Sequence, residues 1–320
     1  MSADAARAQF PSKYDRLIAA AKAVSPVPTV VVHPCDETSL RGAVDSAQAG
    51  IIKPILVGPE TKIRDTARKF SLDIANFEIV NVAHSEESAA KGVELIHAAK
   101  GEMLMKGSLH TDELMRAVTA KAGGLRTDRR ISHVFVMDVP TYAETLLVTD
   151  AAINIFPDLD AKRDIIQNAI DLYNEAGFGK PPRVAILSAV ETVTTKIPST
   201  IDAAALCKMA DRGQITGGLL DGPLAFDNAI DVEAARIKGI KSEVAGRAQI
   251  LVVPDLEAGN MLAKNLAYFA KADSAGIVLG ARVPIVLTSR ADSPRARMAS
   301  CAVASLHAHA RRRKAPAVAA

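Results

Sequence analysis

Short runs of apolar residues alternate with longer segments of helical periodicity along most of the chain. The apolar runs are rich in Val, Ile and Leu and end in turn residues, which is typical of buried strands. We expect strands at residues 29–32, 54–59, 77–82, 132–138, 145–149, 183–188, 250–253, 275–279 and 284–287. The segments between them predict helices at residues 36–48, 61–70, 85–100, 158–176, 202–212, 255–271 and 293–309.

Strands that alternate with helices require crossover connections, which produce a mainly parallel sheet with helices on both faces. One such series precedes about residue 150, and a second follows it. The sequence therefore predicts an α/β protein of two three-layer α/β/α domains with mainly parallel sheets. A cleft between the domains is the expected place for a ligand.

The composition narrows the class of protein. Of the 320 residues, 49% are hydrophobic and 23% charged, so a large core is expected. Only 4% are aromatic and tryptophan is absent, which disfavours stacking on nucleic-acid bases. The three cysteines, Cys35, Cys207 and Cys301, are far apart, which favours a reducing compartment. No signal peptide and no run of about 18 apolar residues is visible, so we expect a cytoplasmic protein without a membrane partner.

Several motifs of nucleotide and metal chemistry are absent from the sequence. It has no GxxxxGK[ST] phosphate loop, no GxGxxG after a strand, no HExxH and no GxSxG. Gly177-Phe178-Gly179 follows a helix and precedes two prolines, so it indicates a helix end. The seven histidines are scattered, and we expect no metal site.

The segment from Thr288 to Ser293 joins the last strand to the last helix. A strand that leads into a helix N-terminus points backbone N–H groups into the crevice above the sheet, where anions bind. Ser289 adds a hydroxyl donor, and Arg290 adds a bidentate guanidinium that matches phosphate. The alternative is an ordinary helix start, with Ser293 as N-cap and Arg290 paired with Asp292.

A second junction of this kind runs from strand to helix at residues 105–111. Gly107 allows close approach of the backbone, and Lys106, Ser108 and Thr111 offer donors to an anion. The alternative is a plain helix start that Thr111 caps.

Two further segments have the composition of ligand-binding loops. Asp255 ends a strand and either faces the cleft or caps the next helix. Gly259 in the first turn of that helix is costly unless another group packs closely against it, so we expect Gly259 and Asn260 at a ligand site or an interface. Residues 217–227 contain three glycines and two acids, which predicts a loop, either at the mouth of the cleft or elsewhere on the surface.

In their order along the chain, these segments resemble the phosphate acetyltransferase and phosphate butyryltransferase family. The resemblance extends from about Pro28 to about Leu306, and residues 254–260 and 289–290 are its most specific parts. The other shared residues are, in chain order, Lys106-Gly107-Ser108, Asn154, Pro157-Asp158, Leu187-Ser188, Asp221-Gly222-Pro223-Leu224 and Asp227.

The resemblance implies a fold, a reaction and an assembly. The fold would be similar to that of the isocitrate and isopropylmalate dehydrogenases, with domain I at residues 1–148 plus 289–320 and domain II at 149–288. The reaction would convert acyl-CoA and phosphate reversibly into acyl phosphate and free coenzyme A, with no cofactor beyond these substrates. An acetyl group is expected, with a butyryltransferase of the same mechanism as the alternative. Members of the family are commonly homodimers.

The resemblance also assigns roles to residues. Ser289 and Arg290 would bind phosphate at the reacting carbonyl. The expected substrate-binding residues are Lys106, Gly107, Ser108, Thr111, Asp255, Gly259 and Asn260. Acetyl-specific members carry an acid seven residues after the serine, proposed as the base for the thiol, and this position is Ala296. The identity of the base therefore stays open, with Asp292 as a neighbouring substitute.

Two other functions stay open on the residues alone. A metal- and NAD-dependent decarboxylating dehydrogenase of similar fold would use clustered aspartates such as Asp221, Asp227 and Asp255. A non-catalytic regulator would bind acyl-CoA or phosphate without turnover.

Overall fold

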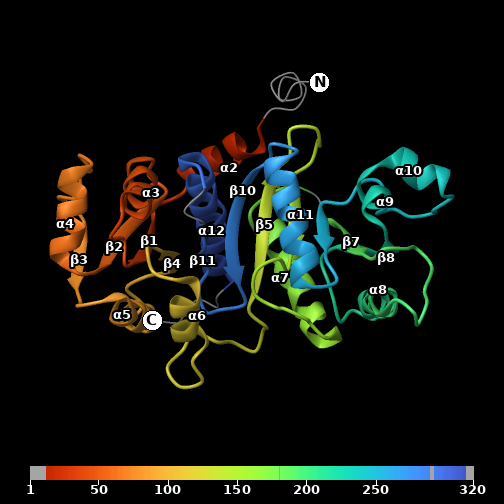
Figure 1. Ribbon diagram of the computed structural model, residues 1–320, viewed down its shortest axis with the longest axis horizontal. Coiled ribbons are helices and arrows are strands. Elements are labelled where there is room, and N and C mark those ends of the chain that lie inside the picture. The colour runs from red at the N-terminus through yellow and green to blue at the C-terminus, as the bar shows by residue number, and fades with distance from the viewer. Residues whose placement is uncertain (1–11, 180, 289–291, 315–320) are drawn as a thin grey trace. The chain divides into compact units, whose positions relative to one another are not determined.

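A computed structural model describes residues 12–179, 181–288 and 292–314. Backbone contacts divide the chain into two compact units, and Figure 1 labels most of their elements. Of the described residues, unit 1 contains Ser12, Lys13 and those from Arg130 to Ser274, and unit 2 contains those from Tyr14 to Arg129 and from Ala275 onward. The domain boundaries expected after residues 148 and 288 stay a prediction.

Unit 2 is built on a sheet with the strand order β3-β2-β1-β4-β11-β10. Its pairs are parallel except β10 with β11, which is antiparallel. The strands are β1 (Val27–Val32), β2 (Ile52–Gly58), β3 (Glu78–Asn81), β4 (Met103–Lys106), β10 (Asp273–Leu279) and β11 (Ile285–Val286).

Helices cover both faces of the unit 2 sheet. On one face, α12 (Pro294–Lys314) packs on β1, β4, β11 and α3 (Glu37–Gln48), and α4 (Glu60–Lys69) packs beside α3. On the other face, α5 (Ser85–His97) packs on β1, β2 and α6 (Thr111–Thr119). The helix α2 (Lys13–Lys22), which the sequence analysis did not predict, precedes β1.

Unit 1 is built on a sheet with the strand order β5-β6-β9-β7-β8. Only its β5–β6 pair is antiparallel among the described pairs of this sheet. The strands are β5 (Ser132–Asp138), β6 (Leu146–Thr149), β7 (Arg183–Leu187), β8 (Leu219–Leu224) and β9 (Ile250–Val252). The helices are α7 (Leu159–Glu175), α8 (Pro198–Asp211), α9 (Phe226–Ile230), α10 (Val232–Ile237) and α11 (Leu256–Tyr268).

The predicted α/β class with mainly parallel sheets is confirmed. One element was wrongly predicted, because residues 217–227 contain strand β8 and the start of α9 rather than a loop. Strand β8 lies at the end of the strand order and pairs with β7. An edge strand tolerates Pro223, which has no N–H to donate to a further neighbour.

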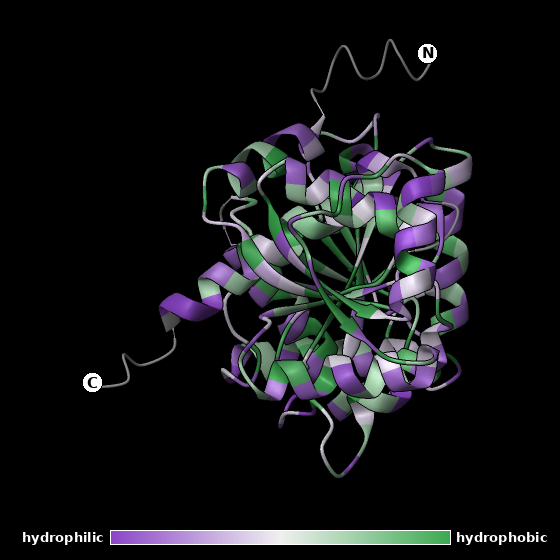
Figure 2. Cartoon of the chain, turned by 90° about the vertical axis from the view of Figure 1, so that its left-hand side faces the viewer, coloured by the Kyte–Doolittle hydropathy of each residue, from purple (hydrophilic) through white to green (hydrophobic). Residues whose placement is uncertain are grey.

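The core consists mainly of Ala, Val, Ile and Leu side chains. Apart from the edge strands β3 and β8, the strands are buried along most of their length. Figure 2 shows the strands mainly in the green of hydrophobic residues, whereas the helices carry purple polar stretches. One charged pair lies inside unit 1: the ammonium of Lys13 is 3.2 Å from Asp138 Oδ1 and donates to the carbonyl of Val139 at 2.8 Å. Among the described residues, no helix is both long enough and apolar enough to cross a membrane.

Candidate functional site

The strand order of unit 2 creates a crevice between the carboxyl ends of β1 and β4. The chain leaves β1 through α3 toward β2 on one side, and it returns through α5 to β4 on the other side. The connections therefore diverge to opposite faces of the sheet, which makes this the switch point at which α/β sheets bind ligands. His33 and Cys35 follow β1, and the predicted segment Lys106–Ser108 ends β4, so both lie at this crevice.

The two strand ends are joined by hydrogen bonds. Gly107 N donates to Val32 O at 2.8 Å, and Ser108 N donates to His33 O at 2.9 Å. The hydroxyl of Ser108 donates to the same carbonyl at 2.8 Å and accepts from Cys35 N at 3.2 Å. A Cβ at position 107 would lie 2.3 Å from Val32 O, so the expected close approach at Gly107 is made by the β1 backbone.

The other residues of this segment are more exposed. Lys106 is half-buried, and its ammonium donates to Gly107 O at 3.4 Å. Thr111 is the exposed first residue of α6. The alternative in which Thr111 caps this helix is wrong, because the N-cap is His110, whose N–H donates to Glu113 Oε2 at 2.8 Å.

Ser289 and Arg290 lie outside the described residues. Asp292, in the same segment, is half-buried. Ser293 caps α12, as in the alternative of an ordinary helix start, because its hydroxyl accepts from Ala296 N at 3.1 Å. Ala296 is buried, so the residue at the position of the expected acid belongs to the packing of α12.

Arg297, which sequence reasoning missed, lies one residue further along α12. Its side chain is buried, and its aliphatic part lies 3.2 Å from the position that a Cβ on Gly42 would take. Burial lowers the pKa of the Arg297 guanidinium, and the carboxylates of Asp292 and Asp36 oppose that shift. An arginine on the apolar face of an alanine-rich helix is the sequence signal that could have identified it.

In unit 1, the predicted residues meet between the carboxyl ends of β6 and β9. Asp255 is the N-cap of α11, because its Oδ1 accepts from Ala258 N at 2.9 Å. A Cβ on Gly259 would lie 2.7 Å from Val253 Cγ2 and 3.0 Å from Asp150 O. Asn260 Nδ2 donates to Ala151 O at 3.2 Å. The expected close packing at Gly259 is therefore present, and it holds α11 against the loop after β6.

The loop after β6 is organised by a buried carboxylate. Asp150 accepts from the backbone N–H groups of Ala152, Ile153 and Asn154 at 3.0–3.2 Å, and from the amide of Asn154 at 2.6 Å. Arg130 Nε donates to Asn154 Oδ1 at 2.8 Å. Asn154, one of the family-like residues, thus links the loop to the start of β5.

His133 lies beside this network and is buried. Burial lowers its pKa to about 4, although the Asp150 carboxylate acts to raise it. The imidazole is therefore neutral near pH 7.

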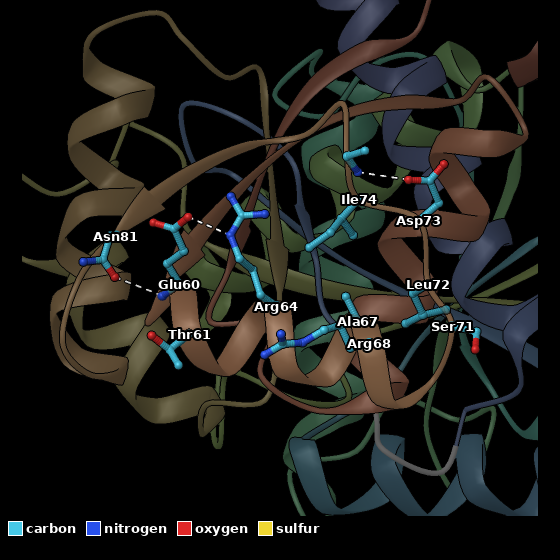
Figure 3. Close-up of a pocket in the computed structure, with 11 residues that line it drawn as sticks. Glu60, Thr61, Arg64, Ala67, Arg68, Ser71, Leu72, Asp73, Ile74 and Asn81 are labelled. Carbon is cyan, nitrogen blue, oxygen red and sulfur yellow. Dashed lines mark hydrogen bonds and ion pairs between the residues drawn. The ribbon is translucent and has the colours of Figure 1, made fainter.

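A groove along α4 and the loop to β3 lies outside the switch point (Figure 3). Its volume is about 670 Å³, and none of its lining residues comes from β1 or β4. Arg64 pairs with Glu60 at 2.7 Å, and Asn81 Oδ1 accepts from Glu60 N at 2.9 Å. Because the charged groups of the groove pair with one another, the groove offers fewer donors to an anion than the β1–β4 crevice does.

Comparison with known proteins identifies the family. The family model described as "Phosphate acetyl/butaryl transferase" matches residues 83–305. A Rhizobium meliloti protein named phosphate acetyltransferase is 72% identical over 302 residues, covering 94% of this chain and 95% of that protein. A Clostridium acetobutylicum phosphate butyryltransferase is 43% identical, covering 85% of this chain and 90% of the relative.

Solved structures of phosphotransacylases share the fold of this chain. A branched-chain phosphotransacylase from Enterococcus faecalis V583 has a TM-score of 0.75 at 27% identity, covering 88% of this chain and 99% of that chain. A 4-hydroxythreonine-4-phosphate dehydrogenase from Burkholderia phymatum, 13% identical, covers 89% of this chain and 98% of that chain with a TM-score of 0.52, so a dehydrogenase shares the fold. On the family model and the extent of these matches, the chain belongs to the phosphate acetyl/butyryl transferase family.

Proposed function

We propose that this protein is a phosphate acetyltransferase, which moves an acetyl group reversibly between coenzyme A and inorganic phosphate. The observation that carries the proposal is the 72% identity, over 94% of the chain, to a relative of that name. Butyryl transfer by the same mechanism is the alternative, and it has less support because the butyryltransferase relative is 43% identical. The substrates are coenzyme A, its acetyl thioester, phosphate and acetyl phosphate, with no further cofactor.

In the direction of acetyl-CoA, the coenzyme A thiolate attacks the carbonyl of acetyl phosphate, and the bond to phosphate breaks. Negative charge develops on the carbonyl oxygen and on the departing phosphate, so the main need is for preorganised donors. Ser289 and Arg290 are the proposed donors at the reacting centre. Lys106 is the proposed phosphate contact on the loop after β4, which is tied to the end of β1 by the hydrogen bonds of Gly107 and Ser108.

The proposed substrate-binding residues of unit 1 are Asp255, Gly259 and Asn260. Asp255 and Asn260 use their side chains to fix the start of α11, so their contribution is to orient the backbone of this turn. The close contact at Gly259 keeps that turn near the loop after β6.

Release of free thiol on mixing acyl-CoA with phosphate tests the proposal. We expect phosphate-dependent release from acetyl-CoA, with propionyl-CoA and butyryl-CoA giving lower kcat/KM. A higher kcat/KM for butyryl-CoA would favour the butyryltransferase instead. Tight binding of coenzyme A without any thiol release would favour the non-catalytic regulator.

We further propose that the protein is a cytoplasmic homodimer. Support for dimerisation comes from exposed apolar side chains at the C-terminal end of α11, where Tyr268 is 67% exposed and the C-cap Phe269 is 86% exposed. Static light scattering should report a dimer for the native chain and a monomer for the double variant Tyr268→Glu, Phe269→Glu. Ile237→Glu, an equally exposed apolar position on α10, is the matched control that should remain dimeric. A monomeric native chain would contradict this part of the proposal.

A further inference from the structure

The backbone of His33 has a positive φ, although His33 follows a strand and not a helix. Four non-glycine residues among those described have a positive φ: His33, Ser71, Ala99 and Lys271, at 53–57°. The last three follow the C-termini of α4, α5 and α11, where a left-handed residue commonly ends a helix. His33 instead follows strand β1. Residues held in this region away from helix ends concentrate at functional sites.

The strands on both sides of β1 hold His33 in place. Its N–H donates to Val57 O on β2 at 2.7 Å. Its carbonyl accepts from Ser108 N at 2.9 Å and from the Ser108 hydroxyl at 2.8 Å. The surroundings therefore determine the conformation of His33, at the switch point between β1 and β4.

Hydrogen bonds also determine which ring nitrogen of His33 carries the proton. Nδ1 lies 3.1 Å from the hydroxyl of Ser88 on α5. That hydroxyl donates its single hydrogen to His84 O at 2.8 Å, so it accepts from His33. In the neutral ring the proton is therefore on Nδ1, and Nε2 keeps a lone pair that can accept a proton.

Charged groups on or beside α3, α4, α5 and α6 act on the pKa of His33. Burial lowers its pKa most, and Lys62 on α4 lowers it further, with a smaller contribution from His84. Glu113 on α6 and Asp36 before α3 act in the opposite direction. The net direction is downward from 6.5, so the ring is mostly neutral at pH 7.

The neighbouring groups are less suited to accept a proton. Burial raises the pKa of the Cys35 thiol to about 11, which keeps it protonated near pH 7. Ala296 has no titratable group, and the charge of Asp292 acts on the buried guanidinium of Arg297.

We propose that His33 Nε2 is the base that takes the proton from the coenzyme A thiol. This inference rests on the proposed function. As the S–H bond breaks, an N–H bond forms on His33, and the sulfur attacks the carbonyl carbon of acetyl phosphate. The S–C bond forms, the C–O bond to phosphate breaks, and the departing phosphate takes the proton from Nε2. The ring is then neutral again, and acetyl-CoA and phosphate are the products.

The variant His33→Asn tests this role without disturbing the backbone. Asparagine tolerates a positive φ better than other residues except glycine, and its amide N–H can donate to Ser88, but it has no basic nitrogen. For acetyl-CoA formation at pH 7 we expect kcat/KM for coenzyme A to fall about 100-fold or more, as for loss of a general base. Between pH 6 and pH 8 the rate of the variant should rise about tenfold per unit, because it depends on thiolate formed in solution, with a pKa of about 8.5.

The native enzyme should show no such rise between pH 7 and pH 8. Two further variants separate this role from a structural one. Ser88→Ala removes the acceptor of the Nδ1 proton and should lower kcat about tenfold, whereas Ser88→Thr keeps the hydroxyl and should restore it. His97→Asn, at the other end of α5, should leave the rate unchanged, because its ring bonds only to the carbonyls of Gly123 and Gly124 in the described contacts.

The outcomes distinguish the two proposals. An active native enzyme together with a His33→Asn variant of similar rate and similar pH profile would overturn the role of His33 alone. A native protein without acyl transfer would overturn the proposed function. If His33→Asn did not fold, equal rates for Ser88→Ala and Ser88→Thr would overturn the role.

Discussion

The contact between Gly107 and the end of β1 gives the sharpest prediction about the site. A Cβ at position 107 would lie 2.3 Å from Val32 O and 2.5 Å from His33 O, whereas ordinary contacts begin at 3.4 Å. Both neighbours are backbone atoms of a buried strand end, so they cannot move aside as a side chain could. In the variant Gly107→Ala the loop must therefore retreat by about 1 Å, the difference between 3.4 Å and 2.3 Å.

That retreat breaks the bonds between the loop and β1. Three hydrogen bonds at 2.8–2.9 Å link Gly107 and Ser108 to this strand end. At about 0.5–1.5 kcal/mol each, their loss should lower the free energy of unfolding by about 1.5–4.5 kcal/mol. A displacement of about 1 Å should also lower turnover about 100-fold.

Urea denaturation and the thiol-release assay measure the two effects separately. Gly58→Ala is the matched control, because its added methyl would meet the flexible end of Ile63 at 3.3 Å and no backbone atom closer than 3.5 Å. Its stability should change by less than about 1 kcal/mol. A Gly107→Ala protein with the stability and turnover of the native protein would mean that the backbone of β1 does not exclude a side chain at position 107.

Three further predictions concern buried charge and the reacting centre. Asp138→Asn removes the carboxylate beside the buried ammonium of Lys13, so urea denaturation should show a loss of about 3–5 kcal/mol, and a loss below about 1 kcal/mol would contradict it. His133 is held neutral by burial, with its pKa lowered to about 4, while in the unfolded chain it binds a proton below about 6.5. Its contribution to stability therefore falls as the pH drops, by about 2 kcal/mol between pH 7 and pH 5, and His133→Leu should remove that part of the pH dependence. Arg290→Ala should lower the rate of acyl transfer about 100-fold or more, and near-normal turnover would remove Arg290 from the reacting centre.

Much of the fold could be predicted from periodicity, because crossover units leave a regular signal. The strands at β5 and β7 and the helices α3 and α7 match their predicted spans within a residue or two. Strand β8 could not be predicted in this way, since Gly222 and Pro223 break the apolar run. Only its place at the edge of the sheet, which depends on the whole topology, makes this sequence acceptable as a strand.

The parts of the candidate site that could be predicted are those where close backbone contact requires glycine. Gly107 and Gly259 were singled out for close approach, and both approach backbone atoms within 3.0 Å of an added Cβ. His33 could not be found from sequence, because its role depends on Ser88, 55 residues away, and on a φ that no pattern encodes. Arg297 was missed for a similar reason, because its burial arises from packing against Gly42 on α3, which is far away in the chain. Asp150 was missed although its partners, residues 152–154, are close in the sequence.

Phosphorus NMR on acetyl-CoA, inorganic phosphate and the native protein tests the proposed reaction most directly. If the protein is a phosphate acetyltransferase, a resonance of acetyl phosphate grows as inorganic phosphate is consumed, in step with the appearance of free thiol. Thiol release without any acyl phosphate would mean that water, rather than phosphate, accepts the acetyl group, and the assignment of acyl transfer to phosphate would then be wrong.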